Sequence, residues 1–170
     1  MSILILSTVR SGSSQLLEAV GKYYNKQVVF EPTTPMYKKS FKPEEDIVKI
    51  VLQTLTTVEL LELINRFNKT VLLDRKDIIA QSESYLNLWN NLEGRYNVSY
   101  VDRGFTSSEI QETVEKFTEW KKKLSVISTK TSIPIVYLED LIKGKDIGIG
   151  YDKTFFEPSH KLRKKVNSLI

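Results

Sequence analysis

Short apolar runs alternate with stretches of helical periodicity along most of the chain. The apolar runs are bounded by polar residues and predict strands at residues 3–7, 28–30, 48–53, 70–74 and 133–138. Apolar residues recur at three- and four-residue spacing after Ser14, Thr56, Asp77 and Thr106, which predicts a helix in each place. This alternation predicts an α/β fold: a three-layer sandwich with helices flanking a mostly parallel central sheet.

Local signals set several of the predicted helix boundaries. Thr56 with Glu59, and Thr106 with Glu109, have the spacing of capping boxes. Gly94 is predicted to end the helix that begins near Asp77, because glycine is the usual residue just past a helix C-terminus.

Other segments lack a clear period. Residues 47–55 fit either a helix or a strand, and their β-branched residues favour the strand. Residues 33–46 are polar and contain two prolines, which predicts a loop. Residues 95–105 are irregular, with a short strand predicted at 98–101, and the basic tail from residue 159 predicts a final helix.

The composition excludes several classes of protein. The 170 residues are enough for one domain, predicted to span residues 1–170. The chain has no cysteine and one histidine, His160, so disulfide scaffolds, thiolate zinc sites and cysteine nucleophiles are excluded. The longest early apolar run, at residues 3–6, is too short for a signal peptide or a membrane span, which predicts a cytoplasmic protein.

The charge balance is basic. Lysine and arginine number 25 against 21 aspartates and glutamates, a formal net charge of +4. Such a balance favours anionic partners such as nucleotides and phosphates, and the alternative is a solvated, lysine-rich surface. The lysines at 121–123, within a predicted helix, are expected to form such a surface. No nucleic acid is expected, because no recognised nucleic-acid-binding motif accompanies the charge.

A polar loop of small residues links the first predicted strand to the first predicted helix. It contains Arg10, Ser11, Gly12, Ser13 and Ser14. First-turn N–H groups, the helix dipole, hydroxyl groups and a guanidinium together favour an anion there. The GxxxxGK[ST] consensus of P-loop ATPases and its lysine are absent. The alternative is a serine-capped helix start that binds nothing.

The stretch VRSGSSQLLEAVGKYYNKQVVFEPTTP resembles the start of carbohydrate sulfotransferases. Those enzymes carry an RSGS[ST] loop after the first strand and a second strand that ends in Phe-Glu-Pro. Residues 10–14 and 30–32 stand at a similar spacing here. The resemblance implies a P-loop NTPase-like fold. It also implies that residues 10–14 bind the 5′-phosphosulfate of the sulfuryl donor, 3′-phosphoadenosine-5′-phosphosulfate.

A second segment, VLLDRKDIIAQSESYLNLW, resembles the family's other donor motif. In that motif an arginine at a strand end and a serine on the next helix hold the donor's 3′-phosphate. Arg75 takes the place of the arginine; Ser84 fits the spacing of bacterial glycolipid sulfotransferases, whereas Ser82 fits the wider family. A third segment, IPIVYLEDL, is similar to a late family motif, and Glu139 and Asp140 are expected to have structural, helix-capping roles there.

Candidates for the remaining contacts come from two other segments. Those for the donor's phosphates and adenine are Lys145, Lys153, Arg163, Phe155 and Phe156. Those for the walls of an acceptor site are Tyr37, Phe41, Lys38, Lys39, Lys42 and the segment 95–105.

The resemblance implies transfer of a sulfuryl group to an acceptor hydroxyl on a carbohydrate or glycolipid. Arg10 and the loop amides would stabilise the charge that develops, and Glu31 would accept the acceptor's proton. No metal is expected, because arginine and amides supply the positive charge. His160 matches no base motif of the family.

Other functions remain open. One is a degenerate sulfotransferase-like module that binds a nucleotide without turnover. Another is a different phosphate-transfer enzyme, such as a kinase, for which Asp74 is the candidate metal ligand after a strand. A nucleic-acid module has only the basic tail in its favour. The oligomeric state is not predicted.

Overall fold

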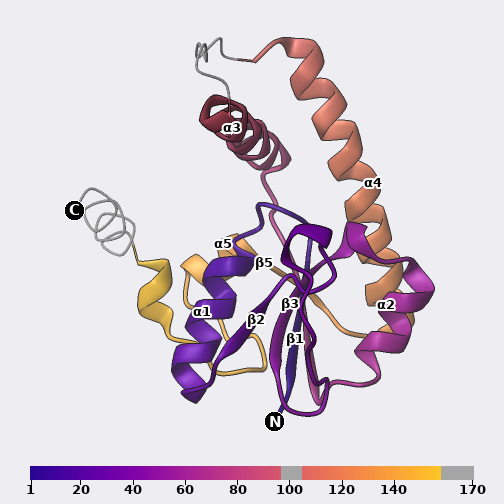
Figure 1. The fold of residues 1–170 in the computed structure, drawn as a ribbon, viewed down its shortest axis with the longest axis vertical. Coiled ribbons are helices and arrows are strands. Elements are labelled where there is room, and N and C mark those ends of the chain that lie inside the picture. Colours follow the sequence, from indigo (N-terminus) through magenta and orange to yellow (C-terminus); the bar gives the residue numbers. More distant parts are fainter. Residues whose placement is uncertain (97–104, 158–170) are drawn as a thin grey trace.

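The computed structural model describes residues 1–96 and 105–157, in which five strands form one parallel sheet (Figure 1). The strands are β1 (Ile3–Ser7), β2 (Val28–Phe30), β3 (Ile47–Val51), β4 (Lys69–Asp74) and β5 (Ile135–Tyr137). Their order across the sheet is β2-β3-β1-β4-β5, and every neighbouring pair is parallel. The predicted α/β sandwich with a mostly parallel sheet is confirmed.

Helices connect these strands. The α-helices are α1 (Ser13–Tyr24), α2 (Thr57–Ile64), α3 (Ile78–Tyr96), α4 (Ser107–Thr131) and α5 (Leu138–Ile142). The shorter 3-10 turns are η1 (Pro35–Tyr37), η2 (Leu52–Thr54) and η3 (Lys153–Phe156). Across the described ranges, no helix combines the length and the apolar character needed to cross a membrane.

The predicted boundaries are largely correct. Both capping boxes are confirmed, at the start of α2 and of α4. The predicted stop at Gly94 is wrong, because α3 continues to Tyr96. A glycine inside a helix costs only about 1 kcal/mol relative to alanine, and the packing of α3 against α4 offsets that. The strand predicted at 98–101, the helix predicted from residue 159, His160 and Arg163 lie outside the described residues.

The sheet is covered on both faces, so its central strand is apolar on both sides. All five residues of β1 are buried. Ile3 and Ile5 pack in the cluster that includes α1 and α5, whereas Leu4 and Leu6 pack in the cluster that includes α2 and α4. Figure 1 shows the same division, with α1 and α5 on one side of the sheet and α2 and α4 on the other. An unbroken apolar run is typical of a parallel strand buried on two faces.

α3 and the first half of α4 stand beyond the carboxyl ends of the strands (Figure 1). An aromatic cluster of Tyr85, Phe117 and Trp120 joins the two helices, with ring centroids of Phe117 and Trp120 4.9 Å apart at near-perpendicular planes. Such edge-to-face pairs contribute about 0.5–1.5 kcal/mol beyond the area they bury. The cluster therefore holds α3 against α4 above the sheet.

Two of the three lysines at 121–123 do not form the predicted solvated surface. Lys121 Nζ donates to both carboxylate oxygens of Asp74, each at 2.8 Å, at the end of β4. Lys123 Nζ donates to the carbonyl oxygen of Leu52 at 2.7 Å, just after β3. Only Lys122 behaves as predicted, in an exposed ion pair with Glu119. Because α4 crosses the sheet edge here, its inward lysines meet the carbonyl and carboxylate groups of two strand ends.

The segment after α5 packs along α1. The backbone N–H of Asp152 donates to the carbonyl of Ala19 at 3.0 Å, and the Asp152 carboxylate pairs with Lys22 at 2.6 Å. Phe156 is buried against Tyr151, with ring centroids 5.8 Å apart. The Phe156 ring is therefore part of the core rather than a cover for adenine.

Stability at low pH is expected to depend on Asp152. Hydrogen bonds from Lys22 and then Thr154 lower the pKa of Asp152 to about 2, against roughly 4 in an unfolded chain. The folded-state pKa is depressed, so its stabilisation is complete above about pH 5 and declines as the pH falls towards 2. We expect Asp152→Asn to cost about 1 kcal/mol of unfolding free energy at neutral pH. In urea titrations this difference should stay constant between pH 7 and about pH 5 and shrink from there towards pH 3.

Lys22→Met serves as the matched control, because it removes the same ion pair from the other side. A difference between wild type and Asp152→Asn that does not change with pH would contradict this account.

Candidate anion-binding site

The connections of β1 and β4 leave the sheet in opposite directions. After β1 the chain passes through α1 to β2, whereas after β4 it passes through α3 and α4 to β5 on the other side. α1 and α4 cover opposite faces. In open parallel sheets such a switch point leaves a crevice at the carboxyl ends of the two strands, where ligands bind. Residues 8–12 and Arg75 lie at this point.

The loop between β1 and α1 has the backbone of an anion site. Arg10 (φ 57°) and Gly12 (φ 82°) are both left-handed, a conformation that turns successive N–H groups towards one side of the loop. Gly12 is the N-cap of α1 and provides no side-chain cap, so no serine caps the start of this helix. A Cβ at Gly12 would lie 2.6 Å from Leu138 Cδ1. Ser11 is buried, and its Oγ donates to the carbonyl of Thr8 at 2.7 Å.

A buried polar network fixes the start of this loop. Thr8 Oγ1 donates to Asp74 at 2.7 Å, and Lys121 donates to the same carboxylate. Gln81 Nε2 donates to Thr8 Oγ1 at 2.9 Å and to the carbonyl of Val9 at 2.7 Å. Asp74, the candidate metal ligand of a kinase-like enzyme, is thus already bonded to a lysine and a hydroxyl.

Arg10, Arg75 and Ser84 come together beside the loop. Arg10 Nε donates to Ser84 Oγ at 2.9 Å. Ser82, the other serine candidate, is fully buried, and its Oγ has no hydrogen-bond partner among the described residues. Arg10 keeps access to solvent, yet the protein around its guanidinium and then the nearby charge of Arg75 lower the pKa of Arg10. Two guanidiniums close enough to repel each other could both donate hydrogen bonds to one anion.

A buried lysine joins the loop from the neighbouring strand. Lys49, in the middle of β3, is 4% exposed and donates from Nζ to Ser14 Oγ at 2.9 Å. It also donates to the carboxylate of Glu31, at the end of β2, and lies 4.5 Å from the centre of the Phe30 ring. Burial lowers the pKa of Lys49, the Glu31 carboxylate opposes that shift, and the charge of Arg10 adds to it. Glu31 and Ser14 are therefore brought together through one ammonium group.

Lys49 belongs to none of the motifs that predicted the site, although the sequence carries a signal for it. The loop has no P-loop lysine of its own, as expected, but a lysine reaches it from β3. The segment IVKIV is apolar except for Lys49 and is buried throughout. A charge in such a strand has to find a partner inside the protein, since lysines are almost never fully buried unpaired.

The other candidates have structural contacts. Asp140 accepts from the backbone N–H of Tyr137 at 3.3 Å and caps α5, as predicted. Glu139 instead accepts from the N–H groups of Lys76 and Asp77, just before α3. Burial raises the pKa of Glu139, but these backbone bonds and the charge of Arg75 outweigh it, so the net shift is downward.

The C-terminal candidates also have partners within the protein. Lys153 Nζ donates to the carbonyl of Gly144 at 2.7 Å, and Lys145 lies 3.9 Å from the carboxylate of Asp140. The Phe155 ring lies 5.5 Å from the ammonium of Lys22, and its carbonyl accepts from Gln15 in α1. Phe155 is thus fixed against α1.

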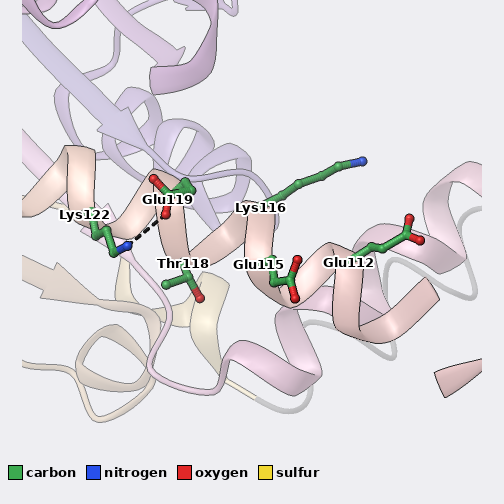
Figure 2. Close-up of a pocket in the computed structure, with 6 residues that line it drawn as sticks. All are labelled: Glu112, Glu115, Lys116, Thr118, Glu119 and Lys122. Atoms are coloured by element: carbon green, nitrogen blue, oxygen red, sulfur yellow. Dashed lines mark hydrogen bonds and ion pairs between the residues drawn. The ribbon is translucent and has the colours of Figure 1, made fainter. Parts of the chain in front are cut away.

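A depression on α4 does not have the features of a site. Its lining comes entirely from α4: Glu112, Glu115, Lys116, Thr118, Glu119 and Lys122. Figure 2 shows these side chains spread along one helix, with the Lys122–Glu119 ion pair as the contact between them. No opposing wall faces them, so groups do not converge on a ligand. Within residues 1–96 and 105–157, no three His, Asp or Glu side chains gather closely enough to hold a metal ion.

Comparison of the chain with protein-family models, with curated proteins and with solved structures found no match. The function of the site therefore has to be inferred from its own residues. Those are the N-terminus of α1, which has no side-chain cap, the cations Arg10, Lys49 and Arg75, and the carboxylate of Glu31.

We expect the buried Lys49–Glu31 pair to serve binding rather than stability. Replacing a buried ion pair with neutral side chains of similar volume is often neutral or stabilising. The double variant Lys49→Met/Glu31→Gln should therefore change the free energy of unfolding by no more than about 1 kcal/mol. Its affinity for inorganic pyrophosphate, measured by calorimetry, should fall about tenfold or more.

The exposed pair on α4 provides the matched control. Lys122→Met/Glu119→Gln should alter neither the stability nor pyrophosphate binding. Loss of several kcal/mol of stability in the Lys49 double variant, with pyrophosphate binding intact, would make the pair structural.

Proposed function

We propose that the protein is a sulfotransferase that moves a sulfuryl group from 3′-phosphoadenosine-5′-phosphosulfate to an acceptor hydroxyl on a carbohydrate or glycolipid. One observation carries the proposal. Arg10 follows β1 and lies near Arg75, which follows β4, while Lys49, from the middle of β3, bonds to Ser14 at the N-terminus of α1, which has no side-chain cap. Positive charge distributed between two points of one crevice suits a ligand with two separated anionic groups, as this donor has.

The proposed donor contacts follow the order of the strands. The 5′-phosphosulfate binds the backbone N–H groups at Gly12 and Ser13, with the Ser14 hydroxyl beside them. The 3′-phosphate binds Arg75 and Ser84, at the end of β4. Ser84, rather than Ser82, is the proposed contact because its hydroxyl is already bonded to Arg10, whereas that of Ser82 is buried.

The proposed reaction is an in-line displacement at sulfur. The acceptor oxygen forms a new bond to sulfur, the bond from sulfur to the bridging oxygen breaks, and adenosine-3′,5′-diphosphate leaves. Arg10, Lys49 and the loop N–H groups stabilise the negative charge that grows on the bridging oxygen. Glu31 accepts the acceptor's proton, because Lys49 has the sulfuryl oxygens and Ser14 as alternative partners once the donor is bound.

A kinase-like alternative has weaker support. It needs a metal-binding carboxylate near the loop, and Asp74 is engaged by Lys121 and Thr8. The degenerate, non-catalytic module shares the donor site and differs only in turnover.

Donor binding is the first test. Calorimetry should show that adenosine-3′,5′-diphosphate binds more tightly than ATP with magnesium. Arg10→Ala and Arg75→Ala should each lower the affinity for the diphosphate by roughly ten- to a hundredfold, because each removes a charged hydrogen bond to phosphate. Ser84→Ala should weaken it measurably, and Ser82→Ala, the matched control, should not.

Preference for ATP with magnesium, or indifference to Arg75→Ala, would refute the donor assignment. Turnover separates the enzyme from the degenerate module. Glu31→Gln should keep diphosphate binding and lose most sulfuryl transfer from labelled donor, by about a hundredfold or more.

A further inference from the structure

An exposed aromatic pair lies at the carboxyl end of β2. The rings of Phe30 and Tyr37 meet edge to face, with centroids 5.2 Å apart and planes at 81°. Their exposed fractions are 39% and 47%, so both side chains remain partly accessible to solvent. Phe30 ends β2, an edge strand, and Tyr37 ends the η1 turn that follows. Two aromatic side chains held together at the surface form a small, rigid, partly apolar platform.

The platform adjoins the proposed base. Glu31 follows Phe30 directly, and the Lys49 ammonium that Glu31 binds lies 4.5 Å from the centre of the Phe30 ring. Hydroxyl groups follow Glu31 in the chain. Thr34 Oγ1 lies 3.5 Å from Glu31 Oε2, and the hydroxyl oxygens of Thr33 and Thr54 are 2.6 Å apart. An acceptor resting on the platform would therefore have its hydroxyls next to Glu31.

The sheet order separates the platform from the proposed 3′-phosphate contacts. β2 and β4 lie on opposite sides of β1. A donor that extends from the β1 loop towards Arg75 and Ser84 leaves the side above β2 and β3 open. The acceptor can then approach from this side, over Phe30 and Tyr37.

The neighbouring candidates do not extend the platform. Phe41 stacks on Phe67, with centroids 6.3 Å apart, and packs against the core. Lys38 and Lys39 are exposed, and Lys42 pairs with Glu45 at 3.5 Å. Of the described residues in the predicted acceptor walls, Tyr37 belongs to the platform, and Phe30 is added to it; residues 97–104 of the other predicted wall lie outside the described residues.

We propose that Phe30 and Tyr37 form the acceptor subsite and that it holds a pyranose ring. This inference rests on the proposed function and adds the acceptor's shape and direction. A pyranose has a C–H face that packs on an aromatic ring and a rim of hydroxyls that reaches neighbouring polar groups. With the C–H face on the platform, one hydroxyl of the rim faces Glu31, which takes its proton as the oxygen bonds to sulfur.

The test uses the full chain saturated with adenosine-3′,5′-diphosphate. The probes are the methyl glycosides of glucose, galactose, mannose and N-acetylglucosamine, with 4-nitrophenol as the planar aromatic alternative. Saturation-transfer NMR should show contact between at least one glycoside and the protein. Tyr37→Ala should weaken binding of that glycoside about tenfold. In separate assays with 3′-phosphoadenosine-5′-phosphosulfate in place of the diphosphate, it should raise the glycoside's KM as a sulfuryl acceptor by the same factor, while Tyr37→Phe retains both values.

The controls separate this proposal from the proposed function. Tyr23→Ala removes another exposed tyrosine, in the last turn of α1. It should change neither the affinity for the glycoside nor the glycoside's KM. Diphosphate affinity should be equal in wild type and Tyr37→Ala. If the diphosphate binds but no glycoside does, or if 4-nitrophenol alone is sulfated, or if Tyr37→Ala leaves the glycoside KM unchanged, the acceptor subsite is refuted and the donor site stands. If the diphosphate does not bind, both proposals fall.

Discussion

The carboxylate of Asp74 is the point on which the carboxyl edge of the sheet depends. It is nearly inaccessible to solvent, and a buried charge is costly unless it is paired and fully hydrogen-bonded. Lys121 and Thr8 meet that requirement, and Gln81 then joins Thr8 to α3. A single charge thus ties β4, the loop after β1, α3 and α4 together.

The loop itself is held in a state of unbalanced charge. Lys49 has a carboxylate partner in Glu31, but Arg10 bonds only to the neutral hydroxyl of Ser84 among the contacts described for it. Arg10 and Glu31 are both non-glycine residues with positive φ, a conformation that costs free energy unless surrounding contacts enforce it. The fold therefore stores electrostatic and backbone strain at one edge, and an anion bound there would relieve the electrostatic part.

Much of the fold could be predicted because its signals are local. A capping box such as Thr56 with Glu59 depends on four consecutive residues. A run such as ILILS predicts a strand buried on two faces. The site was harder, because its geometry depends on residues distant in sequence. Lys49 reaches Ser14 across 35 residues and Lys121 reaches Asp74 across 47, and no spacing rule covers such contacts. The difference between Ser82 and Ser84 likewise depends on which side of α3 meets the protein interior.

The segment that packs along α1 has a consequence for how the chain folds. The N–H of Gly150 bonds to the Tyr24 hydroxyl across 126 residues, and Gln15 bonds to the carbonyl of Phe155 across 140. During synthesis, α1 and the loop before it are made well before residues 150–156, which pack against α1. Contacts of such long range close slowly, because the entropy of a large loop is lost before they form. α1 therefore leaves the ribosome well before the residues that complete its packing.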